Sequence, residues 1–151
     1  MDLSHLRVLV FARPPRLLRL AGAIHALGAQ VRAVDSLSAV LVRLPAHVPH
    51  LLVVDLGDEG EAYALMDHVR GLPPRQGGRV AAASIGPVLL ERGRLERWQG
   101  KGFQLHMVDP VDPVELRAVI ETLGGRSIER RSPRRGPWRA FERRALAFVT
   151  H

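Results

Sequence analysis

Hydrophobic residues gather in five short runs along the chain, and a segment with helical spacing follows each run. The runs occupy residues 6–12, 31–34, 51–56, 79–85 and 103–108. Apolar runs of this length are typical of strands that are buried in parallel sheets. The helical segments occupy residues 14–27, 36–44, 60–70, 87–99 and 112–123. This alternation predicts an α/β fold, a doubly wound sheet of five parallel strands joined by right-handed crossovers.

Capping and turn residues mark several of the predicted ends. Asp112 is placed to cap the last helix, with Pro113 at its first position and Glu115 three residues after the cap. Gly28 stands where the first helix should stop, and Gly124 stands at the end of the last one. Because the functional groups of doubly wound sheets lie at the carboxyl ends of the strands, candidate residues should follow the apolar runs.

Charge divides the chain into a nearly neutral body and a basic tail. The net charge is +7, but residues 1–124 carry 14 Lys and Arg against 13 Asp and Glu, which is +1. The tail, residues 125–151, carries 8 Arg against 2 Glu, which is +6. We therefore predict one domain over residues 1–124, a basic linker over 125–136 and an amphipathic helix over 137–151.

One face of that last helix carries three aromatic side chains, Trp138, Phe141 and Phe148. The face either docks a partner or a membrane surface, or packs back on the domain. The chain has no cysteine, which excludes disulfides and thiolate sites. It begins without a signal-peptide pattern and has no apolar run long enough to span a bilayer, so we expect a cytoplasmic protein.

Two motifs carry a resemblance. VVDLGDEG closes the third apolar run, and MVDPVDPVEL leads from the fifth run into the last helix. With the five-fold alternation they resemble the receiver domain of two-component response regulators, a flavodoxin-like fold, over roughly residues 6–124. The resemblance makes Asp55 the counterpart of the phosphoacceptor. It also matches Gly57, the hydroxyl residue Ser84 and Pro110, a proline that receivers usually hold in a cis bond.

The sequence departs from the receiver pattern where phosphorylation chemistry is concerned. The resemblance implies an acidic pair that binds Mg²⁺ after the first strand, but Ala12 and Arg13 stand there. It implies a lysine before the proline, but Asp109 stands there. A unit charge about 4 Å away is worth about 4 kcal/mol at an effective dielectric near 20, so both reversals oppose phosphotransfer to Asp55. We expect Arg13 to pair with Asp55 or Asp109.

The residues that transmit phosphorylation in receivers are also altered. Ser84 keeps the hydroxyl, His106 takes the place of the switch aromatic, and Ile85 replaces a small residue next to the phosphoryl position. His106 is either a pH sensor or a partly buried surface histidine. These substitutions predict a fixed switch.

Other chemistry has weaker support in the sequence. The carboxylates of the segment after the third strand form either a cation site or a solvated helix cap; they are Asp55, Asp58, Glu59 and Glu61. His47 and His50 lack a third ligand nearby for a metal site. No glycine-rich phosphate loop follows the first strand, and no nucleophile elbow is present. We expect neither an enzyme nor a bound cofactor or metal.

The leading hypothesis is a pseudo-receiver, a phosphorylation-independent protein-interaction module in bacterial signal transduction. The resemblance implies that its docking surface is the face formed by the fourth helix, the fifth strand and the fifth helix. The residues expected on or near this face are Arg94, Arg97, Trp98, Lys101 and His106. The aromatic tail would extend this surface or form a homodimer. Two alternatives stay open: a response regulator phosphorylated at Asp55, and a nucleic-acid-binding regulator using the Arg-rich tail, which lacks a recognised reading motif.

Overall fold

The computed structural model describes residues 2–89 and 92–126. The predicted helix over residues 137–151, with Trp138, Phe141 and Phe148, lies outside the described residues, as does nearly all of the predicted linker over 125–136. In the described part of the chain, no helix is both long enough and apolar enough to cross a membrane.

Five parallel strands form one sheet in the order β2-β1-β3-β4-β5. The strands are β1 (Arg7–Phe11), β2 (Gln30–Val34), β3 (Leu51–Asp55), β4 (Ala81–Gly86) and β5 (Leu105–Val108). The two central strands β3 and β4 are buried throughout, as their continuous apolar runs predict. The predicted doubly wound α/β sheet is therefore confirmed.

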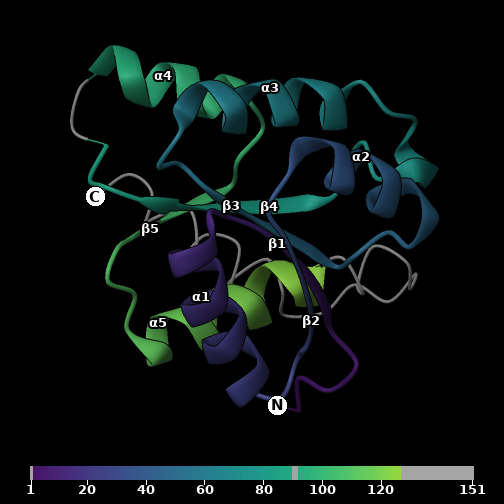
Figure 1. Cartoon of the computed structure of the whole chain (residues 1–151), viewed down its shortest axis with the longest axis vertical. Helices are drawn as coiled ribbons and strands as arrows, with labels where there is room; N and C mark the ends of the chain where they lie inside the picture. The colour runs from purple at the N-terminus through teal and green to yellow at the C-terminus, as the bar shows by residue number, and fades with distance from the viewer. Residues whose placement is uncertain (1, 90–91, 127–151) are drawn as a thin grey trace.

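Helices cover both faces of the sheet (Figure 1). The helices are α1 (Pro14–Ala26), α2 (Leu37–Ala46), α3 (Glu59–Arg70), α4 (Arg92–Gly100) and α5 (Pro113–Val119), with a short 3-10 turn η1 (Pro74–Gln76) after α3. Helices α1 and α5 lie on one face, whereas α2, α3 and α4 lie on the other. Alternate residues of β1 supply the two cores: Val8 and Val10 face α1 and α5, and Leu9 and Phe11 face the other layer.

Three helix ends show clear capping chemistry, and two of them, at Asp112 and Gly28, are as predicted. The Asp112 carboxylate accepts a hydrogen bond of 2.7 Å from the backbone N–H of Val114 at the start of α5. The Ser36 hydroxyl accepts one of 3.2 Å from Ala39 N–H at the start of α2. After α1, Gly28 adopts a positive φ of 98°, which a glycine reaches without strain.

The end of the last helix differs from the prediction. A π-helical turn η2 (Ile120–Gly124) follows α5, and the helical backbone continues through Arg126. Gly124 packs against the N-terminal segment, because a Cβ on it would lie 3.2 Å from the methyl carbons of Leu6. The glycine thus allows close packing inside the helix and does not end it.

Candidate functional site

The carboxyl edge of the sheet brings together most of the residues matched to a receiver site. Asp55 is the last residue of β3, and its side chain is only 7% exposed. It pairs in register with Ile85 of β4. The backbone N–H of Gly57 donates a hydrogen bond of 2.8 Å to Asp55 Oδ1. A Cβ on Gly57 would lie 3.2 Å from that oxygen, so the absence of a side chain lets the loop close over the carboxylate.

A guanidinium from α1 joins the two aspartates of this edge. Arg16 Nη1 lies 2.6 Å from Asp55 Oδ1, and Arg16 Nη2 lies 2.9 Å from Asp109 Oδ2. The side chain of Arg16 is 24% exposed and that of Asp109 is 34% exposed. One positive charge therefore bridges two carboxylates through charge-assisted hydrogen bonds.

The prediction that Arg13 pairs with Asp55 or Asp109 is wrong. Arg13 is the N-cap residue of α1, and its side chain is 60% exposed. Its Nη2 atom lies 2.6 Å from Glu61 Oε2 on α3 and 3.5 Å from Asp58 Oδ2. Sequence reasoning missed Arg16, which is the third residue of α1 and lies in its first turn. Helical side chains lean toward the N-terminus of their helix, so a long side chain in the first turn reaches back to the strand ends.

Little empty space is left beside Asp55. The hollow there has a volume of about 10 Å³, and the residues that line it are Phe11, Ala12, Arg13, Asp55, Asp58 and Glu61. A single water needs a cavity of about this size. A phosphoryl group with a hydrated Mg²⁺ ion is much larger, so it requires the side chains of this hollow to move.

The acidic segment after β3 makes ion pairs and a helix cap. Asp58 caps α3 by accepting a hydrogen bond of 3.0 Å from Glu61 N–H. Glu59 pairs with Nε of Arg94 on α4, and Glu61 pairs with Arg13. Among residues 2–89 and 92–126, no three His, Asp or Glu side chains lie close enough to share a metal ion. The arrangement favours the solvated-cap interpretation over the cation site.

Ile85 and Pro110 define the other side of the edge. Ile85 is buried in the core next to α1 and α5, in the position where the resemblance implies a small residue. The Asp109–Pro110 peptide bond is cis, as the resemblance implies. Together with Arg16 and Asp109, these residues line a shallow hollow of about 200 Å³ between α1 and α5.

The switch residues form a closed hydrogen-bond chain. Ser84 is fully buried, and its Oγ accepts a hydrogen bond of 2.7 Å from Trp98 Nε1. The same Oγ lies 2.7 Å from His106 Nδ1, and His106 Nε2 lies 2.7 Å from the carbonyl oxygen of Pro87. A carbonyl can only accept, so in a neutral imidazole Nε2 carries the ring proton and Nδ1 accepts from the Ser84 hydroxyl. This chain connects the Ser84 hydroxyl to α4 through Trp98 and to β5 through His106.

The surroundings of the histidine in this chain favour its neutral form. Burial lowers the pKa of His106 below its ordinary value, and the nearby Arg94 lowers it further, whereas the hydrogen bond to Pro87 opposes the shift. The edge of the Trp98 ring faces the imidazole at 6.3 Å between ring centroids. The lowered pKa favours the neutral ring, which is the form in which Nδ1 accepts from the Ser84 hydroxyl.

One residue assigned to the predicted docking surface, Trp98, is buried in the structure. Trp98 is 1% exposed and stacks on Phe103 with ring centroids 5.9 Å apart, so its assignment to the surface is wrong. Its indole faces the core because α4 must bury a side chain against the sheet, and Ser84 satisfies the N–H. Arg97 is exposed, and Lys101 lies 2.9 Å from Asp67 Oδ1.

The two histidines before β3 lie in different surroundings. His50 is buried, and its Nδ1 accepts a hydrogen bond of 2.9 Å from the backbone N–H of Arg7. His47 is exposed at the end of α2. The buried histidine thus connects the segment before β3 to the start of β1.

Comparison with known proteins connects this geometry to one fold. No protein-family model matches the sequence, and no curated protein sequence matches it either. Solved structures do match. The receiver-domain protein (CheY-like) of Methanospirillum hungatei JF-1 superposes with a TM-score of 0.69 at 14% identity, over 83% of this chain and 98% of that chain. The fold is that of receiver domains.

Two further structures support this assignment. The signal receiver domain of a histidine kinase from Syntrophus aciditrophicus has a TM-score of 0.67 at 20% identity, over 80% of this chain and 90% of that chain. The chemotaxis response regulator CheY4 of Vibrio cholerae has a TM-score of 0.67 at 12% identity, over 78% of this chain and 98% of that chain. Identities this low establish the fold and leave the chemistry to be argued from the site.

Proposed function

We propose that the chain is a pseudo-receiver, a receiver domain in bacterial signal transduction that binds protein partners without phosphorylation of Asp55. The observation that carries the proposal is the bridge from Arg16 to Asp55 and Asp109. Phosphoryl transfer depends on positioning and charge stabilisation, which receivers obtain from Mg²⁺ and a lysine. Here the Arg16 guanidinium pairs with the carboxylate of Asp55, and Asp109 stands in place of the lysine.

The charges at the edge also oppose the arrival of a phosphoryl group. Asp55 and Asp109 carry two negative charges against the single positive charge of Arg16. An incoming acyl phosphate adds further negative charge, and its Mg²⁺ ion would meet a guanidinium where receivers have acidic ligands. The hollow of about 10 Å³ leaves no room for either group without rearrangement.

The switch chain supports a fixed interaction surface. In receivers the hydroxyl moves toward the phosphoryl group, and the strand-five aromatic follows it. Here the Ser84 hydroxyl is hydrogen-bonded to both Trp98 and His106, so moving it inward would leave the buried indole N–H without its acceptor. An unsatisfied buried donor costs about 1–3 kcal/mol. We infer that Arg97, Lys101 and the exposed part of His106 belong to a surface that keeps one shape.

An amide NMR titration with Mg²⁺ and beryllofluoride, a mimic of the phosphoryl group, tests the proposal. We expect the amide resonances of Asp55, Ser84 and His106 to stay unshifted at millimolar ligand. As a control, the same reagents should shift the corresponding resonances of an active receiver. A saturable shift that Asp55→Asn abolishes would show a working phosphoacceptor and refute the pseudo-receiver.

Partner binding is tested separately, by affinity purification from the native cell. A partner of the proposed surface should be retained by Asp55→Asn and lost with Arg97→Glu, which reverses an exposed charge of α4. Loss of the partner with Asp55→Asn would make the carboxylate essential to signalling. Retention with Arg97→Glu would place the interaction on another surface.

A further inference from the structure

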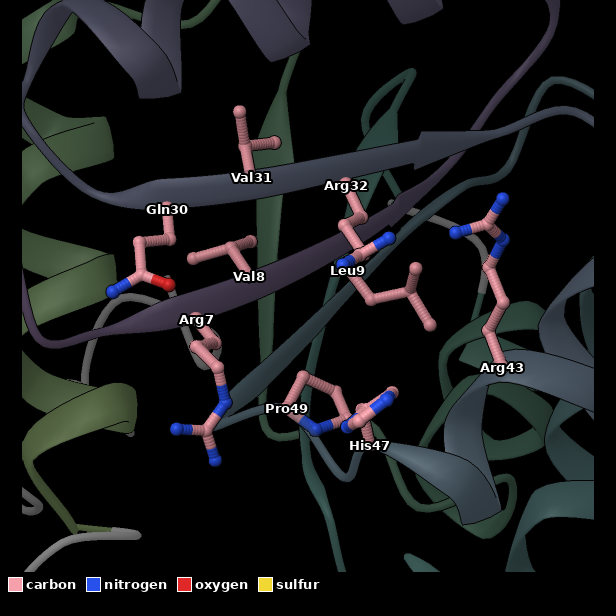
Figure 2. A pocket seen from close by; sticks show the side chains of 9 residues that line it. All are labelled: Arg7, Val8, Leu9, Gln30, Val31, Arg32, Arg43, His47 and Pro49. Atoms are coloured by element: carbon pink, nitrogen blue, oxygen red, sulfur yellow. The ribbon is translucent and has the colours of Figure 1, made fainter.

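A hollow of about 410 Å³ lies at the opposite end of the sheet from Asp55 (Figure 2). Its walls come from the beginnings of β1 and β2, from the last turn of α2 and from the segment before β3. The lining residues are Arg7, Val8, Leu9, Gln30, Val31, Arg32, Arg43, His47 and Pro49. Ligands of doubly wound sheets ordinarily bind at the carboxyl ends of the strands, so this hollow is separate from the receiver site.

The hollow exists because α2 does not cover the edge of the sheet. Strand β2 is an edge strand, and four of its five residues are at least partly exposed. Leu9 and Arg32 are register partners on β1 and β2, so both side chains point to the face where α2 lies. Helix α2 ends at Ala46, and the chain then returns toward β3 through His47 and Pro49, which close the hollow from below in Figure 2.

The charge of the lining is entirely of one sign. Three arginines, Arg7, Arg32 and Arg43, come from three different elements, and the exposed imidazole of His47 joins them. Among residues 2–89 and 92–126, no Asp or Glu lines the hollow. Within the described part of the chain, Arg32 and Arg43 form no ion pair, in contrast to the arginines around Asp55.

Arg7 is held in place and keeps donors for a ligand. Its Nη2 donates to the carbonyl oxygen of Val48 at 3.2 Å, and its backbone N–H donates to His50. A guanidinium has five N–H donors, so others are left over. Like charges repel when no anion separates them, and a multivalent anion would relieve that repulsion.

Apolar groups form the remaining wall. Leu9 is buried at the floor and Pro49 is buried beside the opening, whereas the side chains of Val8 and Val31 pack in the core on the other face of the sheet. The volume falls within the range of roughly 300–1,000 Å³ that small-molecule sites occupy. A bare phosphate ion would fill a small part of it. The site therefore fits a ligand with a flat or apolar body and an anionic group.

We propose that this hollow binds a nucleoside phosphate. A guanidinium can donate two parallel hydrogen bonds to two phosphate oxygens, and it can also stack on a planar ring. These properties suit the phosphate and the base of such a ligand. Phosphate binds at the arginines, and the base lies against Leu9 and Pro49. Binding at this site gives a pseudo-receiver a small-molecule input that does not involve Asp55, although the proposal does not rest on the function assigned to that residue.

Amide NMR of the full chain with adenosine monophosphate tests the site. We expect saturable shifts at Leu9, Arg32 and His47, weaker binding of inorganic phosphate and no shift with adenosine. Removal of a charged hydrogen bond should weaken binding at least about tenfold in Arg32→Gln and in Arg43→Gln. The matched control is Arg19→Gln, an exposed arginine of α1 on the opposite face, which should bind as the unmodified protein does.

Several results would overturn the proposal. Absence of saturable shifts at millimolar adenosine monophosphate excludes the ligand class. Inorganic phosphate that binds as tightly as the nucleotide removes the role of the apolar wall. If Arg32→Gln and Arg43→Gln both bind the nucleotide as tightly as the unmodified protein does, the ligand binds elsewhere. Shifts with a polyglutamate peptide but not with the nucleotide would assign the surface to an acidic protein segment. Unchanged amide dispersion in the variants shows that they fold.

Discussion

Removal of the Arg16 guanidinium is the most direct perturbation of the carboxyl edge. In Arg16→Gln, Asp55 keeps the hydrogen bond from Gly57 but loses its only counterion among the described residues, and Asp109 loses its partner as well. A hydrogen bond to a charged group is worth about 1.5–3 kcal/mol. Breaking a fully buried ion pair costs about 3–5 kcal/mol.

The geometry places this variant at the lower end of those ranges. Asp55 is 7% exposed, but Arg16 is 24% exposed, so water can partly replace the guanidinium. The bond to the half-buried Asp109 adds less than about 1 kcal/mol. We therefore expect a loss of about 2 kcal/mol in the free energy of unfolding. For a domain of this size, this loss corresponds to a decrease of about 6 °C in Tm.

Urea denaturation, with a double-mutant cycle, measures the interaction itself. The matched control is Arg13→Gln, because Arg13 is 60% exposed and its pairs should contribute under about 0.5 kcal/mol. The cycle of Arg16→Gln with Asp55→Asn should give a coupling energy above about 1 kcal/mol, and the cycle with Asp109→Asn a smaller one. Equal losses for Arg16→Gln and Arg13→Gln would refute the assignment of Arg16 as the bridge.

Three further predictions concern stability, each measured by urea denaturation. Trp98→Phe should lose about 1–2 kcal/mol, since the buried Ser84 hydroxyl loses a donor; a neutral result would mean that the indole N–H contributes nothing. The pKa of His106 is lowered in the folded protein, so its contribution to the free energy of unfolding is present above the ordinary pKa near 6.5 and is lost as the pH falls below it. In His106→Gln, the free energy of unfolding should therefore decline less steeply between about pH 7.5 and 5. An unchanged slope of this free energy against pH contradicts this reasoning. Asp112→Ala should lose about 1 kcal/mol by removing the N-cap of α5, and a loss below about 0.3 kcal/mol would show that the cap is replaced by water.

The order of strands and helices could be predicted because it depends on local patterns. Continuous apolar runs, helical spacing and the cap at Asp112 each involve residues close in sequence, and the structure keeps their order, although α4 begins at Arg92 and residues 87–89, predicted as helix, are not helical. The end of α5 could not be predicted in this way. Gly124 is a stop signal by local rules, but its contact with Leu6 joins the two ends of the described chain. Tertiary packing thus overrides the local preference of the glycine.

Side-chain assignments failed where reach and burial decide the outcome. Arg13 and Arg16 are both close to the strand ends in sequence, and only the direction of the helix determines which one reaches Asp55. Trp98 lies in a mostly polar segment, which indicates a surface helix. Its burial depends on Ser84 and Phe103, which the fold brings from other elements. The positions of the site residues were predictable, but their partners were not.

The arginine-lined hollow at the opposite end of the sheet could not be predicted because of how charge is distributed along the chain. Residues 1–124 have nearly equal numbers of acidic and basic side chains, so composition gives no sign of an anion site. In the fold, these charges are segregated: Arg13 and Arg16 pair with carboxylates at one end of the sheet, whereas Arg32 and Arg43 pair with none among the described residues at the other. The net charge of residues 1–124 adds the charges at both ends of the sheet, so it does not show that one end is cationic. Only the parallel register, which sets Leu9 beside Arg32, shows that a neutral domain presents a cationic hollow.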